Sequence, residues 1–465
     1  MRETKALSIS FAMPLVPLAA ALVLAGCSFA PTYERPVAPV ASAWTSGVST
    51  SSVAANELAW RDFAQDARLR EAIALALENN RDLRLATLNI AQVRAQYQIQ
   101  SAARLPTINA AATGSRQSSG DNEIASAYTA GLTMSGWEID FFGRIASLKE
   151  AALAQYLASE EARNAAQTSL VAGVASTWLS LQTSDELLAL TRRTLKTRED
   201  SLRLTQLRFK SGVVSALDLR QAESLLAAAQ STFAQQQRQR ALDLNALTLL
   251  VGQSVPTSAL PVSNGAATAL ADVAAGVPSE VLTRRADVRA AEQQLIAANA
   301  NIGAARAAFF PRISLTASVG TASSELSGLF KSGAWGFSLA PQALLPIFDA
   351  GRNQAGLEVA KAQRDIAVAQ YEKVIQTAFR EVADALAGRD TLGEQWIAQQ
   401  AQAQAESERF RLADLRYRNG VSNYLDVLDA QRSLFGTQQA LSQTRLAQQQ
   451  NRVALYKALG GGWRE

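Results

Sequence analysis

Three aspartates follow two similar glycine turns, and their spacing allows two kinds of chemistry. Asp218 follows the turn at Gly212, while Asp426 and Asp429 follow the turn at Gly420. Asp426 and Asp429 fall on one face of a helix, because residues three apart are neighbours on a helical surface. A carboxylate at the third helical position can cap the start of the helix. Several carboxylates around a narrow opening would instead create a negative potential that favours cations.

Enzymatic chemistry has little support in the composition. The 465 residues include no histidine and one cysteine, so the commonest general base is absent, as are the Cys/His clusters of most zinc sites. We therefore expect no enzyme, no metal site and no cofactor. Lys+Arg 45 against Asp+Glu 41 gives a formal net charge of +4, without a basic stripe, so we expect no nucleic-acid partner.

The aspartates lie in a stretch of sequence that occurs twice. Residues 202–252 match residues 410–460 at an offset of 208 positions. Further upstream the offset is 205, and the matching pairs there are Asp82 with Asp287, Arg84 with Arg289, Pro106 with Pro311, and Ile108 with Ile313. A repeat of this length indicates two copies of a whole structural unit, so any function must make sense twice.

Residues 1–26 form a targeting segment that is excluded from the fold. A charged start is followed by an apolar run over 7–24, which ends in Leu24-Ala25-Gly26-Cys27. This pattern resembles a bacterial lipoprotein signal, in which the cysteine is lipidated and becomes the mature N-terminus. The alternative is an ordinary signal peptide followed by a free thiol. Ser28 stands where an aspartate is associated with inner-membrane retention, and this points to the outer membrane.

Each copy contains two stretches in which polar and apolar residues alternate, a pattern that predicts strands. In the second copy, for example, Ile313, Leu315 and Ala317 alternate with polar neighbours. The four predicted strands cover 106–115, 127–139, 311–321 and 334–346. Segments of about ten residues suit a membrane barrel, and a soluble hairpin packed on helices is the alternative.

Two long stretches without proline, 144–211 and 352–419, predict very long helices. At about 1.5 Å per residue, each helix spans roughly 100 Å. A seven-residue apolar repeat in the first stretch predicts a left-handed coiled coil. The residues of this repeat are Val174, Leu181, Leu188, Leu195, Leu202 and Phe209. Shorter helices return beside each long one, and they are expected over about 66–103 with 215–250, and over about 279–309 with 422–459.

Four strands are too few to close a membrane barrel, since the smallest known barrels have about eight. Open strand edges are also excluded from hydrocarbon, because unpaired backbone groups find no water there. Sister copies of the chain must therefore complete the wall. Two copies give eight strands, and three give twelve with room for a channel. We expect an oligomer and favour three copies.

Four segments carry the signatures of a known family. Residues 31–36 (PTYERP) are similar to its opening after the acylated cysteine, and 137–144 (WEIDFFGR) and 346–352 (PIFDAGR) resemble its strand-to-helix signature. The most specific segment is 277–292 (VPSEVLTRRADVRAAE), which has Ala286 where the family usually has proline. On these segments the chain resembles the TolC-like outer-membrane efflux proteins, specifically the OprM-type lipoproteins.

The resemblance implies an α+β membrane protein built from a duplicated helix–β-hairpin–long helix–helix unit. Its trimer would form a 12-stranded outer-membrane β-barrel continued by a periplasmic α-helical coiled-coil barrel, with irregular segments near 29–65, 253–278 and 460–465 as a belt. The implied function is the outer-membrane channel of a tripartite efflux system that passively conducts drugs and toxic small molecules. The implied partners are a homotrimer, a periplasmic adaptor (membrane fusion) protein, an inner-membrane RND-type pump and outer-membrane lipid.

The expected domains follow from the repeat and the resemblance. They are a signal peptide over 1–26, a lipidated N-terminal and equatorial segment over 27–65, a first repeat over 66–252, an equatorial linker over 253–278, a second repeat over 279–460 and a tail over 461–465.

The resemblance also assigns roles at the hairpin tips. Asp426 and Asp429 resemble a motif in which acidic rings narrow the periplasmic aperture, and Tyr417 matches a tyrosine that holds this aperture closed. We add Asp218, the repeat counterpart of Asp426, although capping alone would explain it. The arginine that pairs with the tyrosine in one branch of the family falls at Ser422 here.

The two turns themselves would contact the adaptor. Gly212 and Val213 in the first copy, and Gly420 and Val421 in the second, offer small and apolar surface. We expect Gly212 and Gly420 to end the helices in a left-handed conformation. The alternative to adaptor contact is that the apolar turn residues only pack on neighbouring helices.

Three other functions remain open at this point. An exit duct for type I protein secretion is a variant of the favoured function. A lipid-anchored structural coiled coil would explain the long helices but not four amphipathic strands. A periplasmic adaptor carries one helical hairpin, whereas this chain has two.

Overall fold

The computed structural model describes residues 29–41, 43–44, 58–118, 124–262, 268–274 and 283–463. The expected signal peptide and the expected lipidation site Cys27 lie outside the described residues. The chain forms two compact units. Unit 1 consists of Met1–Val37, Asn89–Ser159 and Ala290–Tyr371, and unit 2 consists of Ala38–Leu88, Glu160–Arg289 and Glu372–Glu465.

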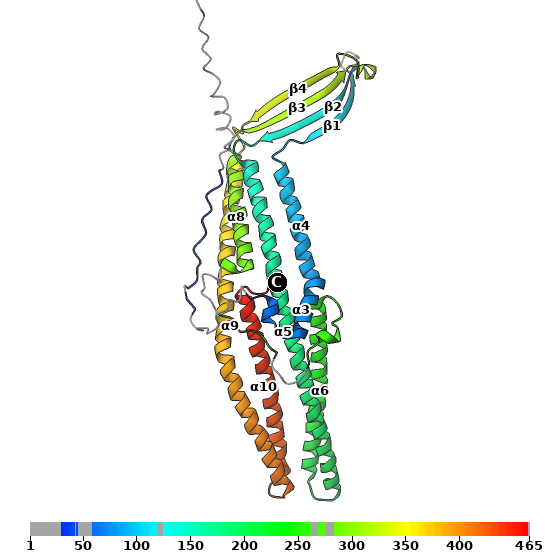
Figure 1. Ribbon diagram of the computed structural model, residues 1–465, viewed down its shortest axis with the longest axis vertical. Coiled ribbons are helices and arrows are strands. Elements are labelled where there is room, and N and C mark those ends of the chain that lie inside the picture. Colours follow the sequence, from blue (N-terminus) through cyan, green and yellow to red (C-terminus); the bar gives the residue numbers. More distant parts are fainter. Residues whose placement is uncertain are drawn as a thin grey trace, which may run out of the picture. The chain divides into compact units, whose positions relative to one another are not determined.

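The two halves of the chain repeat one order of elements (Figure 1). The first half contains α2 (Trp60–Phe63), α3 (Ala67–Asn79), α4 (Arg81–Ala102), β1 (Ile108–Ser118), β2 (Ile124–Ile139), α5 (Arg144–Lys210) and α6 (Ala216–Val251). The second half contains α8 (Ala286–Ala307), β3 (Arg312–Ser323), β4 (Trp335–Leu344), α9 (Arg352–Arg418) and α10 (Tyr424–Ala458). Short 3-10 helices cover Thr257–Ala259 and Leu326–Gly328.

The strands of unit 1 form one antiparallel sheet in the order β1-β2-β3-β4 (Figure 1). The two hairpins meet where Gly131 of β2 faces Gly320 of β3. A Cβ atom on Gly131 would lie 2.2 Å from the carbonyl oxygen of Val319, so this contact requires glycine. β1 and β4 are the outer strands and each has one neighbour in the sheet.

The long helices α5 and α9 begin at the predicted residues and end one residue before the predicted ends. A glycine with positive φ precedes each of them, Gly143 at 70° and Gly351 at 84°. The carboxylates of Asp140 and Asp349 then accept hydrogen bonds from backbone N–H groups of the first turns. These carboxylates satisfy N–H groups that a helix start otherwise leaves unpaired.

The helix expected over 66–103 is two helices, α3 and α4, because Asn80 interrupts it. Asn80 has an extended backbone with ψ of 130°, and its Oδ1 accepts a 2.9 Å hydrogen bond from the N–H of Leu83. Its Nδ2 donates to the carbonyl of Leu250, also at 2.9 Å. In the second half residues 283–284 are helical, Arg285 is not, and α8 begins at Ala286. The start of the helix expected over about 279–309 falls within 275–282, outside the described residues.

Only part of the predicted seven-residue apolar repeat of α5 is buried. Val174 and Leu181 are buried, but Phe209 at the end of the row is 40% exposed. Beyond Leu181 the buried residues that recur every seven positions are polar, namely Ser184, Thr191, Arg198 and Thr205. The hydroxyl of Thr191 donates to the carbonyl of Leu187 at 2.8 Å, so this small side chain is satisfied within its own helix. Leu188, Leu195 and Leu202 of the predicted repeat are only half-buried.

The largest apolar core lies in unit 2 and includes parts of the expected belt. The ring of Phe63 stacks on Tyr456 at 3.9 Å between centroids, and the Tyr456 hydroxyl donates to the carbonyl of Leu58 at 2.7 Å. Ala64 forms an isolated antiparallel bridge with Leu270. Residues 29–37, by contrast, belong to unit 1, so the expected single segment over 27–65 is divided between the units.

In the part of the chain that the structure describes, no helix combines the length and the apolar character needed to cross a membrane.

Candidate functional site

The two hairpin tips of unit 2 have the same backbone geometry. Gly212 and Gly420 have φ of 70° and 71°. The N–H of Val213 donates to the carbonyl of Arg208, and the N–H of Val421 to that of Arg416, each at 2.9 Å. Together with the bonds from the two glycine N–H groups, this is the Schellman helix end, which favours glycine at the left-handed position. The prediction of left-handed helix ends is confirmed.

Asp218 caps the start of α6. The Ser215 hydroxyl accepts from the N–H of Asp218 at 3.2 Å. Oδ2 of Asp218 accepts from the N–H of Ser215 at 3.0 Å and from its hydroxyl at 2.7 Å. This is a complete capping box. The carboxylate of Asp218 therefore already has partners within its own turn.

Asp426 holds the same position in α10 but uses its carboxylate differently. Asn423 is the N-cap residue, and its Oδ1 accepts from the N–H of Asp426 at 3.2 Å. The reciprocal bond of a capping box does not form. The Asp426 side chain is exposed, and its carboxylate has no hydrogen-bond or ion-pair partner within the described residues. Capping thus explains both the backbone and the carboxylate contacts of Asp218. For Asp426 it explains only the hydrogen bond of the backbone N–H.

Asp429 is held by two arginines. Its two carboxylate oxygens lie 2.6 Å from Nη2 of Arg409 and 2.6 Å from Nη2 of Arg432. The hydrogen bond from Arg409, with the nearby charge of Arg432, lowers the pKa of Asp429 below its ordinary value. The position matching Asp429 in the first copy is Gln221, so this cluster exists only at the second tip.

Tyr417 connects the two hairpins of one chain. The Arg208 side chain on α5 donates to the Tyr417 hydroxyl on α9, and its guanidinium lies 4.9 Å from the centre of the Tyr417 ring. The Tyr424 ring packs on the Tyr417 ring, with 4.9 Å between the two centroids. The sequence indicated Ser422 as the position of an arginine partner, and the arginine found here is Arg208. Its only sequence signal is the match of Arg208 with Arg416 in the repeat.

The ends of the tips are open and apolar. Val213 is 70% and Val421 is 66% exposed. A Cβ atom built on Gly212 or on Gly420 meets no other atom within 4 Å. Each tip therefore presents a small apolar surface that the described parts of the same chain leave uncovered.

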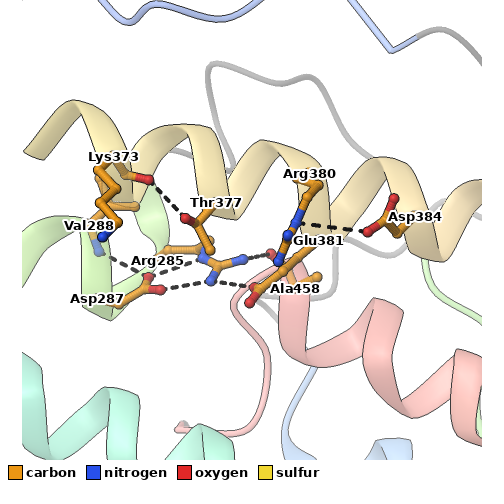
Figure 2. A network of polar contacts seen from close by, with 9 residues as sticks. All are labelled: Arg285, Asp287, Val288, Lys373, Thr377, Arg380, Glu381, Asp384 and Ala458. Carbon is orange, nitrogen blue, oxygen red and sulfur yellow. Dashed lines mark hydrogen bonds and ion pairs between the residues drawn. The ribbon is translucent and has the colours of Figure 1, made fainter.

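A second polar cluster of unit 2 centres on Arg285 (Figure 2). Its guanidinium donates to both carboxylate oxygens of Asp287 at 3.0 and 2.7 Å. It also donates to Glu381 at 2.8 Å and to the carbonyl of Ala458 at 2.8 Å. The Arg285 side chain is 6% exposed. The cluster thus ties the start of α8 to α9 and to the last turn of α10.

The Arg285 cluster is the repeat counterpart of the Asn80 contact described above. Asn80 matches Arg285 at the offset of 205, and Leu250 matches Ala458 at the offset of 208. In both copies a side chain at the helix break donates to the last turn of the returning helix. Burial alone would raise the pKa of Asp287, but the hydrogen bond and charge of Arg285 outweigh it, so this pKa lies below its ordinary value.

Known proteins resemble this chain over almost its whole length. The family model described as outer membrane efflux protein matches residues 72–253 and 277–461. The toluene efflux pump outer membrane protein TtgC of Pseudomonas putida is 48% identical over 457 residues, which are 96% of this chain and 94% of the relative. The antibiotic efflux pump outer membrane protein ArpC of the same species has the same identity and coverage.

A solved structure supports the fold independently. The open state of the MtrE outer membrane channel of Neisseria gonorrhoeae is 42% identical, with a TM-score of 0.88, and the match covers 94% of this chain and 99% of that one. The hairpin geometry and the sheet therefore belong to an outer-membrane channel fold. The chain belongs to the outer membrane efflux protein family and is the outer-membrane channel component of an efflux system.

Proposed function

We propose that three copies of this chain form one continuous duct, with twelve strands in the outer membrane and a helical barrel in the periplasm. The observation that carries the proposal is the four-stranded sheet, in which β1 and β4 each have one neighbour. Backbone groups on such edges need partners within hydrocarbon. Edge pairing between copies would supply these partners and close the wall.

The helices of unit 2 support assembly from several copies. Their tips expose leucines in matching positions of the two repeats, namely Leu204, Leu207, Leu412 and Leu415. Exposed apolar patches of this kind mark interaction surfaces. Neighbouring copies of the coiled coil would cover them.

The duct passively conducts drugs and toxic small molecules that a periplasmic adaptor and an inner-membrane RND-type pump deliver. The relatives named for toluene and antibiotic efflux support small molecules as cargo over proteins of a type I secretion system. The adaptor would contact Gly212 and Val213 of the first tip and Gly420 and Val421 of the second. These residues suit that role because they are open and apolar.

The aperture residues divide into two kinds. Asp426 would contribute a ring of three free carboxylates, because its side chain has no partner within the described part of its own chain. Asp429 and Tyr417 would hold the tip in a narrow state through their arginine partners. Asp218 would act indirectly by fixing the first turn. Rings of carboxylates of this kind favour cations.

Cys27 would be lipidated and would anchor the mature chain in the outer membrane. A lipid chain gains about 0.8 kcal/mol for each buried methylene, so several chains make a durable anchor.

The experiment measures purified full-length protein in detergent and in planar bilayers. We expect the mass of three copies and a narrow, cation-preferring channel. Replacing both Asp426 and Asp429 with Ala should raise the single-channel conductance and weaken the cation preference. The matched control is Asp218→Ala, which removes a carboxylate used in capping and should change stability more than selectivity.

Two results would contradict the proposal. A stable monomer that never permeabilises a bilayer would exclude the duct. Unchanged conductance and ion preference in a folded double variant would exclude the aspartates as aperture residues and leave the duct in place. Sensitivity of a deletion strain to toxic compounds, restored by the unmutated gene, tests the cargo separately.

A further inference from the structure

The first described residues of the chain form a strap along α8 in unit 1. We use the name N-terminal strap for residues 29–35. Nη1 of Arg306 donates to the carbonyl of Phe29 at 2.9 Å, and Nδ2 of Asn299 donates to the carbonyl of Pro31 at 2.7 Å. Both bonds are accepted by backbone carbonyl groups of the strap, so they hold its backbone along the helix.

The other end of the strap is held by Glu292. Nε and Nη2 of Arg35 donate to its two oxygens at 2.7 and 2.9 Å. The Tyr33 hydroxyl also donates to Glu292 at 3.0 Å. Glu292, Asn299 and Arg306 are seven residues apart, so they lie on one face of α8. The strap therefore has contacts along about four turns of helix.

Gly303 makes room for the strap. A Cβ atom at this position would lie 2.7 Å from the backbone nitrogen of Ala30 and 2.5 Å from Oγ of Ser147. Backbone atoms cannot move aside as a flexible side chain can, so any larger residue would push the strap off the helix. Glycine in the middle of a helix is otherwise unfavourable, and here the close approach of Ala30 explains it.

The strap ends in an aromatic cluster at the junction between strands and helices. The Phe29 ring stacks on Phe310 with 4.5 Å between centroids, and Phe310 stacks on Phe142 at 5.0 Å. Cys27 is two positions before Phe29, and two extended residues span at most about 7 Å. The strap thus confines the start of the mature chain to the neighbourhood of this cluster.

A cavity of about 410 Å³ opens at the same cluster. Its apolar lining includes Ile139, Phe142, Phe310, Pro311 and Leu344. Three arginines also line it. Arg144 and Arg312 lie 2.8 and 2.6 Å from Glu138, and the charge of Arg352 acts on Asp349.

We propose that this cavity binds one fatty acyl chain carried by Cys27. The inference rests on lipidation of Cys27, which is part of the proposed function. The occupant is an acyl chain of the protein itself because the strap places its attachment point within reach and the lining is largely apolar. A phospholipid phosphate is less suited, because the carboxylates of Glu138 and Asp140 line the same cavity and would repel it. The strap then aligns the anchor with the junction of strands and helices.

The test uses a photoreactive fatty acid. Cells that produce the full-length protein are fed palmitate with a diazirine near its middle, the purified protein is irradiated, and crosslinked peptides are identified by mass spectrometry. Intact mass reports acylation independently of crosslinking. We expect crosslinks in the peptides that contain Phe142 and Phe310. The variant Gly303→Ala should release the strap and lose these crosslinks while keeping acylation.

Gly356→Ala is the matched control, because Gly356 is a helical glycine of α9 in the same unit with no other atom within 4 Å of an added Cβ. It should keep both acylation and the crosslinks. Crosslinks that fall only on the strap or on exposed strand residues would overturn the inference, with acylation and conductance intact. So would equal crosslinks from an added photoreactive phospholipid in Cys27→Ser. An intact mass without acyl groups would overturn the anchor as well, while channel conductance would still report on the duct.

Discussion

Replacing Arg285 with Met should loosen the junction between α8 and α10 by about 3 kcal/mol. The hydrogen bond from the charged guanidinium to the Ala458 carbonyl contributes about 2 kcal/mol, because bonds to charged groups are worth about 1.5–3 kcal/mol. Asp287 and Glu381 are 40% and 34% exposed, so after the change they can be rehydrated. Their two ion pairs therefore contribute about 0.5 kcal/mol each, as for exposed pairs. Methionine keeps most of the volume of the side chain, which limits any cavity.

The matched variant in the other repeat is Asn80→Ala. It removes the cap on the N–H of Leu83, worth about 1 kcal/mol, and the hydrogen bond to Leu250, worth about 1 kcal/mol more. The expected loss is about 2 kcal/mol at the first junction. Because Asn80 has no charged partner, its loss should not depend on salt, whereas the loss at Arg285 should become smaller at high salt.

Amide hydrogen exchange of the assembled protein measures both losses locally. A loss of about 3 kcal/mol corresponds to roughly a hundredfold faster exchange, since about 1.4 kcal/mol is tenfold. Arg285→Met should speed exchange in the first turn of α8 and the last turn of α10. Asn80→Ala should act on the matching turns of α4 and α6. Exchange that stays within about threefold of the unmutated protein at the junction of a variant would contradict these contributions, and so would equal effects of each variant on both junctions.

Three further predictions concern single groups of unit 2. Gly420→Ala should lower the free energy of unfolding by about 1 kcal/mol, because alanine is strained at φ of 71°. The melting temperature should fall accordingly. The control Gly436→Ala lies in a helix with open space around an added Cβ and should not lower it. Tyr417→Phe keeps the ring beside Arg208 but loses the hydrogen bond. Amide hydrogen exchange at both tips should therefore rise by less than with Tyr417→Ala. Equal effects of the two variants would show that the contact between Arg208 and the ring contributes no stability. The pKa of Asp287 lies below its ordinary value, because the hydrogen bond and charge of Arg285 outweigh burial. Its stabilisation is therefore complete above the ordinary carboxylate pKa of about 3.9 and is lost as pH falls from there through the folded pKa. Melting curves recorded as the pH is lowered from neutral into this acid range should show the loss, and Arg285→Met should remove it.

Much of the fold followed from local rules in the sequence. Alternation placed the strands within three residues at each end, and the glycine-arginine signatures placed the starts of α5 and α9 correctly. The break at Asn80 was missed because helical periodicity continues through it, and the contact that favours it is with Leu250, far away in the chain. The buried row of α5 was missed in part because an apolar repeat does not show which side of a helix its own chain covers.

The candidate site was predictable where a single turn determines it. Gly212, Gly420 and the cap at Asp218 depend on residues within a few positions, and their geometry is as expected. The pairing of Arg208 with Tyr417 depends on how two hairpins pack, 209 positions apart. The N-terminal strap was missed for the same reason. A side chain such as Asn299 shows its partner only once the chain is folded.

The outer strands of the sheet have a consequence for how the protein is made. A newly exported copy carries two rows of unpaired N–H and C=O groups, along β1 and along β4. Such rows template fibrillar aggregates, and side chains of β4 such as Phe337 are apolar and exposed. Ring closure consumes both rows at once, whereas open-ended stacking always leaves two. Biogenesis is therefore a kinetic competition between a closed ring and an unlimited polymer, and slow, chaperoned delivery of copies favours the ring.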